Sequence, residues 1–243
     1  MEVLTGLDPE VQRSLQSFVD AAGTALEDDL HAVVLFGSAA EGRLRPMSDV
    51  NLLLVLKRFD RARVDRLREP YRTARAAIRL GAMFVLETEL PGAMACFAVK
   101  FADIVARHRV LWGPDPFAGL AISREALISR LAQDLLNLRL RLRQSYVLTS
   151  LREEQLSAAI ADAAGPLRVA AAALLGLEGR KAESPKAALA LVAAELGPEW
   201  PPAVTQISEA REQAHLAAGA APTLMLQLIE LTGLLAARLP QAK

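Results

Sequence analysis

VVLFGSAAEGRLRPMSDVNLLLVL, residues Val33–Leu56, is the stretch that decides the fold of this chain. An apolar run rich in Val and Leu ends at Phe36, a second run occupies Val50–Leu56, and a polar loop starting at Gly37 joins them. Apolar runs of this length, bounded by turn residues, are typical of buried strands. The stretch therefore predicts two strands of one sheet with a polar loop between them.

Polar residues stand at both ends of this loop. Gly37 and Ser38 leave the first strand, whereas Asp49 and Asn51 enter the second. Alternate residues of a strand lie on one face, so Asp49 and Asn51 should point the same way, toward the Gly-Ser turn. We expect these four residues to form one site.

This arrangement resembles the nucleotidyltransferase superfamily that includes DNA polymerase beta, kanamycin nucleotidyltransferase and the minimal nucleotidyltransferases. Members of that superfamily have an apolar strand, Gly-Ser, a short spacer, and two acidic residues one apart at the start of the next strand. Gly37, Ser38 and Asp49 match the pattern, and Asn51 stands where the second metal-binding carboxylate would be. The resemblance implies a small mixed β-sheet domain with ATP or another NTP as its ligand.

The same resemblance assigns roles to the loop. Gly37 and Ser38 would hold the triphosphate through backbone N–H groups and the Ser hydroxyl, donors that suit a phosphate. Arg43 and Arg45 could add charge-assisted contacts to that phosphate. The alternative is that Gly-Ser is only a tight turn and that both arginines are solvated.

The superfamily also implies a metal site. Its active members use three carboxylates to hold two divalent cations, which activate the attacking hydroxyl and steady the departing pyrophosphate. Here Asp49 would ligate the metal and Asn51 would assist it in catalysis, with Mg²⁺ as the candidate ion. An amide oxygen can face Mg²⁺, but it adds no negative charge.

The third carboxylate should come from a neighbouring strand. Phe97 and Phe101 alternate with other residues in a pattern that predicts a strand from Cys96 to Ile104. Lys100 is the polar-face residue of that strand, so its ammonium would replace the carboxylate, lie beside the nucleotide and pair with Asp49. The nearby acidic candidates are Asp103, Glu87 and Glu89.

These substitutions predict a degenerate nucleotide site. We expect a protein that handles NTPs and whose transfer of a nucleoside monophosphate to an unknown acceptor is weak or lost. One alternative is a non-catalytic nucleotide-binding or regulatory module, and another is a homodimeric scaffold.

The remaining part of the first half alternates helices and strands. Asp8 and Pro9 begin a helix, and the Arg-rich segment Asp60–Leu80 predicts an amphipathic helix bent at Pro70. Acidic residues offset several of its arginines, which favours a solvated face over contact with a polyanion. Strands are expected at Ala82–Glu87 and Val110–Trp112.

The second half is rich in Ala and Leu, which places a domain boundary near Leu120. We expect a nucleotidyltransferase-like domain over residues 1–120 and a helical bundle over residues 121–243, an α/β plus α architecture. The last helix, which is apolar on most sides, should be its central member. The segment Phe97–Gly119 and the Arg- and Leu-rich helix after it are similar to uncharacterised bacterial nucleotidyltransferase-like proteins. Such bundles often shape the substrate cleft or form dimers, and this one begins with helices expected from Ser123 and over Glu153–Leu175, the latter with a kink or break at Gly165-Pro166.

Composition limits the remaining function classes. The 28 basic and 28 acidic residues balance, so net charge does not indicate nucleic acid or an anionic membrane as a partner. The single Cys96 excludes an internal disulfide and has the apolar surroundings of a core thiol. No secretory signal or spanning segment stands out, and we expect a cytoplasmic protein.

Overall fold

The computed structural model describes residues 6–42, 44, 49–213 and 216–240 of the chain. It divides into two compact units. The first contains the residues up to Ala95 together with Phe101–Ala121, and the second contains Cys96–Lys100 and the residues from Ile122 onward. Each unit is described by itself below.

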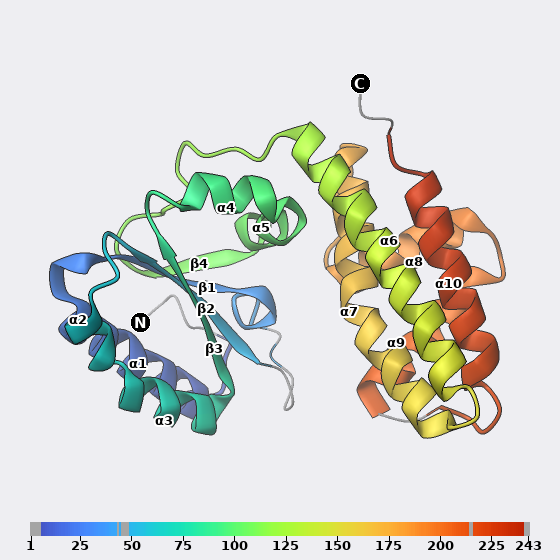
Figure 1. Cartoon of the computed structure of the whole chain (residues 1–243), viewed down its shortest axis with the longest axis horizontal. Coiled ribbons are helices and arrows are strands. Elements are labelled where there is room, and N and C mark those ends of the chain that lie inside the picture. The colour runs from blue at the N-terminus through green and yellow to red at the C-terminus, as the bar shows by residue number, and fades with distance from the viewer. Residues whose placement is uncertain (1–5, 43, 45–48, 214–215, 241–243) are drawn as a thin grey trace. The chain divides into compact units, whose positions relative to one another are not determined.

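The first unit is built on a four-stranded sheet with helices packed against it (Figure 1). Its elements, in chain order, are α1 (Pro9–Leu26), η2 (Glu27–Asp29), β1 (Leu30–Phe36), η3 (Gly37–Ala39), β2 (Val50–Leu56), α2 (Arg61–Asp65), α3 (Arg68–Ile78), β3 (Leu80–Leu86), α4 (Leu90–Cys96) and β4 (His108–Trp112). The helix α5 (Ala98–Ala106) contributes residues to both units.

The strand order of the sheet is β3-β2-β1-β4. β1 runs antiparallel to both β2 and β4, whereas β2 and β3 are parallel and are joined by α2 and α3. The sheet is therefore mixed. Both strands predicted in Val33–Leu56 are present, and the strand predicted at Ala82–Glu87 is β3.

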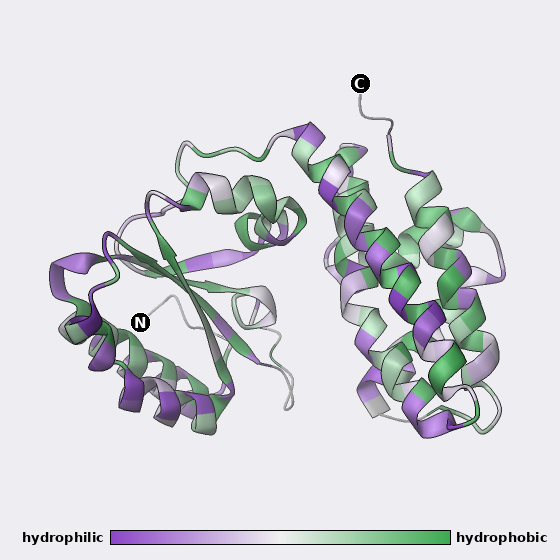
Figure 2. Cartoon of the chain, in the orientation of Figure 1, coloured by the Kyte–Doolittle hydropathy of each residue, from purple (hydrophilic) through white to green (hydrophobic). Residues whose placement is uncertain are grey.

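Both faces of the sheet are buried, which explains why its central strands are apolar throughout. On one face Leu35 and Leu54 pack in one cluster with Phe18 of α1. Val34 and Leu53, which alternate with them, are fully buried as well. Figure 1 shows α1 and α3 on one side of the sheet and α4 on the other. Figure 2 shows mostly hydrophobic colouring along β1, β2 and β3, and hydrophilic colouring on much of α2 and α3.

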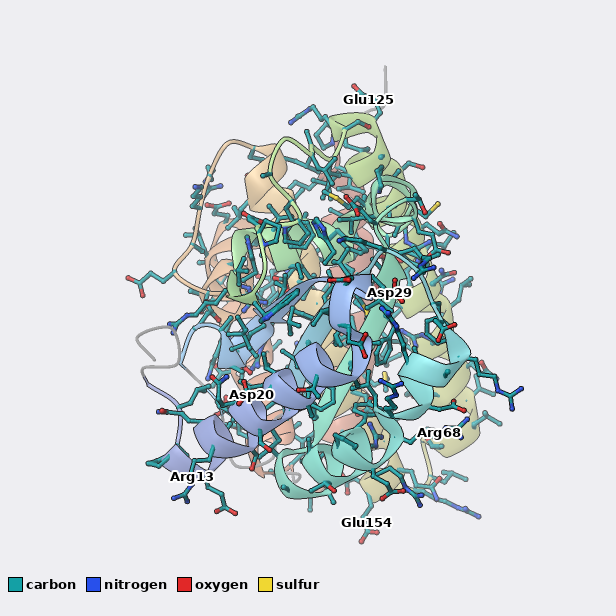
Figure 3. The ribbon with its side chains drawn as sticks, turned by 90° about the vertical axis from the view of Figure 1, so that its left-hand side faces the viewer. Arg13, Asp20, Asp29, Arg68, Glu125 and Glu154 are labelled. Atoms are coloured by element: carbon teal, nitrogen blue, oxygen red, sulfur yellow. The ribbon has the colours of Figure 1, made fainter. Side chains whose placement is uncertain are left out.

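The Arg-rich segment forms two helices rather than one bent helix. The chain turns between α2 and α3, and Pro70 lies in the first turn of α3, where a proline is tolerated. Its arginines are not uniformly solvated either. Arg63 of this segment approaches Asp29, labelled in Figure 3, to 2.9 Å. Arg58, just before the segment, also approaches Asp29 to 2.9 Å, and its guanidinium holds the pKa of that buried carboxyl below its usual value.

The second unit is a helical bundle, as the sequence predicted. It contains α6 (Arg124–Thr149), α7 (Glu153–Leu177), α8 (Pro185–Leu196), α9 (Trp200–Gln213) and α10 (Ala221–Ala237). Helix α7 contacts each of the other four and runs unbroken through Pro166. Helix α7 is thus the central member of the bundle. The expectation that the last helix is central was wrong, because α10 packs substantially against α6, α7 and α9 but not against α8.

Two further expectations require correction. Residues 96–104 form no strand but the end of α4 and most of α5, and Cys96 is exposed rather than buried in a core. Among the described residues, α7 alone is long and apolar enough to cross a membrane, and half of its most apolar window is buried inside the bundle.

Candidate functional site

The polar residues predicted to act together lie where the strands of the sheet start or end, and this end of the sheet is called the edge below. The strand registers pair Phe36 with Asn51, Asn51 with Gly81, and Phe36 with His108. These four residues therefore form one row across the sheet, where β1 ends and the other three strands begin. The Gly37 turn and Asp49 lie immediately beyond this row.

The turn after β1 is built around Gly37. Its φ of +76° is left-handed, a conformation that a glycine adopts without steric cost. The chain then makes the short helical turn η3, in which the N–H of Ala40 donates to the carbonyl of Gly37 at 3.1 Å. Ala39 is fully buried and Ser38 is half-buried, so the turn is anchored by its third residue while its Ser stays accessible.

Asn51 lies between two glycines. Its Nδ2 donates to the backbone carbonyl of Asp49 at 3.3 Å. A Cβ placed on Gly37 would lie 3.9 Å from this Nδ2, and a Cβ on Gly81 would lie 3.3 Å from the Oδ1. The structure thus brings Asn51 beside the Gly37 turn, and the absence of a side chain at Gly81 leaves room for the amide.

Asp49 is held by an arginine from the neighbouring strand end. The Nε of Arg79 donates to the Oδ1 of Asp49 at 2.8 Å, and both side chains are about half exposed. The pairing follows from the register, because Val50 lies opposite Leu80 and the residues preceding them therefore face each other. Within the first unit the charged partner of Asp49 is thus Arg79, whereas Lys100, which was predicted for that role, belongs to the other compact unit.

The two glutamates considered as a third carboxylate lie at the opposite edge of the sheet. The N–H of Glu87 donates to the carbonyl of Leu56, the last residue of β2, at 2.8 Å. The carboxylate of Glu89 accepts the N–H of Leu86 at 2.9 Å. Because Asp49 precedes the first residue of β2, neither glutamate shares an edge with it.

Asp103 is engaged elsewhere. Arg107 pairs with Asp103 at 2.6 Å and with Glu41, just beyond the η3 turn, at 2.7 Å. Burial alone would lower the pKa of Arg107, but the two carboxylates raise it above its usual value. This cluster ties the segment after the Gly37 turn to α5.

Three predicted binding residues remain to be placed. Lys100 lies on α5, within the second compact unit, so it is not the polar-face residue of a strand. Arg43 and Arg45 lie outside the described residues. Their roles toward a nucleotide stay predictions.

The donor set does not fit a two-metal site. No group of three His, Cys, Asp or Glu side chains within the described ranges could hold a metal ion. At the edge itself Asp49 supplies one carboxylate, which Arg79 already neutralises, and Asn51 supplies a neutral amide. The structure thus offers far less negative charge than two dications need.

Sequence reasoning missed Arg79, Gly81 and Arg107. Arg79 was grouped with the solvated arginines of α3, although it immediately precedes β3 as Asp49 immediately precedes β2. Aligning the starts of two parallel strands would have found that pair. For Arg107 the only local signal was Asp103 four residues earlier, because its other partner, Glu41, is far away in the sequence.

Comparison with known proteins bears on the fold. No family model and no curated protein matches the chain. Among solved structures, the spectinomycin adenyltransferase AAD(9) from Enterococcus faecialis, crystallised with ATP and spectinomycin, matches with a TM-score of 0.65 and 12% sequence identity. The match covers 91% of this chain and 99% of that one. The chain therefore has the fold of a nucleotidyltransferase with its helical domain.

Proposed function

We propose that this chain is a nucleotide-binding protein that takes ATP or another NTP at the sheet edge around Gly37, and that its nucleotidyl transfer is weak or lost. The observation that carries the proposal is the Asp49–Arg79 ion pair beside the Gly37 turn. The turn keeps a left-handed glycine and an accessible Ser, which suit phosphate oxygens. The carboxylate that would begin a metal site is neutralised instead.

The proposed roles of Gly37, Ser38 and Asn51 follow from their positions, and those of Arg43 and Arg45 follow from the sequence alone. Gly37 and Ser38 would contact the triphosphate, Asn51 would orient it through its amide, and Arg43 and Arg45 would add charge from the loop. ATP in the spectinomycin adenyltransferase structure supports the choice of nucleotide, since the two proteins share the fold.

Calorimetric titration with ATP tests the binding. Gly37→Val should weaken ATP binding at least about tenfold, because a β-branched residue cannot adopt a left-handed φ without distorting the turn. Gly119→Val is the matched control, since Gly119 has a φ of +78° and open space around it. No ATP binding by the wild type, or an equal effect of both variants, would contradict the proposal.

Transfer is measured separately with ATP labelled in the α-phosphate. We expect no transfer, or slow transfer, to water or small hydroxyl compounds. Rapid transfer that requires both Mg²⁺ and Asp49 would show an active enzyme and would refute the loss of activity while leaving nucleotide binding intact.

A homodimeric module is the second candidate. It is favoured by large apolar side chains exposed at the end of α6 and just after it, among them Val147 at 80% and Leu151 at 99% exposure. Apolar patches of this kind often mark protein interfaces. Light scattering distinguishes the candidates, because a protein that stays monomeric at high concentration cannot be a dimeric scaffold.

A further inference from the structure

Arg79 lies between the end of α3 and the start of β3, at the edge where we propose that the nucleotide binds. It ends α3 in a left-handed conformation, φ +52° and ψ +39°, which non-glycine residues rarely adopt. The next residue, Leu80, is fully buried and begins β3 opposite Val50. The backbone on both sides of Arg79 is thus held by helix and sheet, and its side chain leaves from a defined point beside Asp49.

Only one corner of its guanidinium is used. The Nε donates to Asp49, and within the part of the chain that the structure describes neither Nη1 nor Nη2 donates a hydrogen bond. The side chain is 53% exposed, so a ligand can reach it. A guanidinium presents its two Nη groups as a planar fork that matches two oxygens of a phosphate.

The charge balance at this edge requires a cation. An unpaired Asp49 would repel a triphosphate placed at the Gly37 turn, and in the superfamily that the sequence resembles, divalent ions remove such repulsion. The donors here do not fit those ions, whereas Arg79 already lies 2.8 Å from the carboxylate.

We propose that Arg79 takes over the charge role of the metal. Its Nε neutralises Asp49, and its Nη fork binds a phosphate of the NTP, so that binding needs no divalent cation. The inference rests on the proposed nucleotide-binding function and names the group that recognises the triphosphate.

Calorimetry with ATP as the probe, in EDTA and in Mg²⁺, tests this role. The wild type should bind ATP at least as tightly in EDTA as in Mg²⁺. Arg79→Gln should lose roughly ten- to hundredfold in EDTA, the size of a lost charge-assisted contact, and regain part of that affinity in Mg²⁺. Arg79→Lys keeps the charge without the fork and should fall between the two.

Arg75→Gln is the matched control, because Arg75 is an exposed arginine one turn earlier on α3 and should bind ATP as the wild type does. Circular dichroism confirms that the variants are folded. Wild-type binding that requires Mg²⁺, or unchanged affinity of Arg79→Gln in EDTA, would overturn the role of Arg79 while the nucleotide-binding function stands. No ATP binding by the wild type under either condition would overturn both.

Discussion

Two arginines near the Gly37 turn form ion pairs of different burial. Asp49 and Arg79 are half exposed and meet across parallel strand starts, while Arg107 holds two carboxylates with only 18% of its own side chain exposed. Exposed pairs contribute little to stability, whereas a partly buried cation that satisfies two anions is costly to remove. We therefore assign Arg79 mainly to binding and Arg107 mainly to holding the turn.

Replacing Arg107 by Met should lower the free energy of unfolding by about 1–3 kcal/mol, since Asp103 and Glu41 would be left without their cation in a partly buried place. Urea denaturation measures the change. Arg72→Met is the control, because the Arg72–Glu69 pair is largely exposed and its loss should cost less than about 1 kcal/mol. Equal losses in the two variants would show that Arg107 does not hold this segment.

At the scale of elements, the glycine that follows β4 is a tightly packed point of the first unit. β4 ends at Trp112, and Gly113 follows with a φ of +78° against the backbone at the start of β1. A Cβ at Gly113 would lie 2.2 Å from the carbonyl oxygen of His31, which is backbone and cannot move aside easily. The outer strand β4 therefore depends on this glycine, because a larger residue would prevent the chain after β4 from lying against the start of β1.

Gly113→Ala should cost more than about 3 kcal/mol of stability, because steric overlap adds to the strain of a left-handed alanine. Gly119→Ala shares the same φ of +78° and meets nothing within 4 Å. It should cost only about 1 kcal/mol, the backbone part alone. Thermal or urea unfolding of both variants separates the two contributions, and similar losses would mean that the contact with His31 relaxes.

Continuous apolar runs bounded by turn residues were predictable, and a run with an alternating pattern was not. β1 and β2 are long, apolar and bounded by turn residues, so their assignment was confirmed. The run 96–104 failed because Phe97 and Phe101 alternate as in a strand, yet Phe97 is 50% exposed and Phe101 is 2% exposed. The helical spacing of Ala98, Phe101 and Ile104, all buried, prevailed.

The candidate site was predictable only in part for a related reason. Gly37 and Asn51 are brought together by adjacent strands that a loop connects, which the sequence displays directly. The Asp49–Arg79 pair depends on the register of β2 against β3, and Arg107 depends on where α5 packs. Such placements are tertiary, so local patterns do not reveal them.

At the scale of the whole molecule, the 28 basic and 28 acidic residues balance, and several of them form local networks of ion pairs. In a charged network of the bundle, Glu178 after α7 and Glu195 of α8 share Arg180 and Arg238. Arg180 first and Arg238 second lower the pKa of Glu195 from 4.5 to about 2. These contacts join the ends of α7, α8 and α10.

This network predicts an acid-sensitive part of the stability. Because the pKa of Glu195 is lower in the folded state, its contribution is present above 4.5 and is lost as the pH falls through about 2. Glu195→Gln should therefore be less stable than wild type at neutral pH, and the difference should shrink over that range in urea titrations. Glu209→Gln, at an exposed position of α9, should show no such dependence, and a constant difference for Glu195→Gln would contradict the prediction.

Helix α5 contributes residues to both compact units, which affects how the chain can be truncated and how it is synthesised. Val99 belongs to the hydrophobic core of the bundle, whereas Phe101, two residues later, belongs to the compact unit that contains the sheet. A single cut near Leu120 would separate Val99 from that core, so neither half would be released intact. The two units are interleaved in the sequence rather than placed one after the other. During synthesis Val99, a core residue of the bundle, is therefore made before the last residues of the sheet unit.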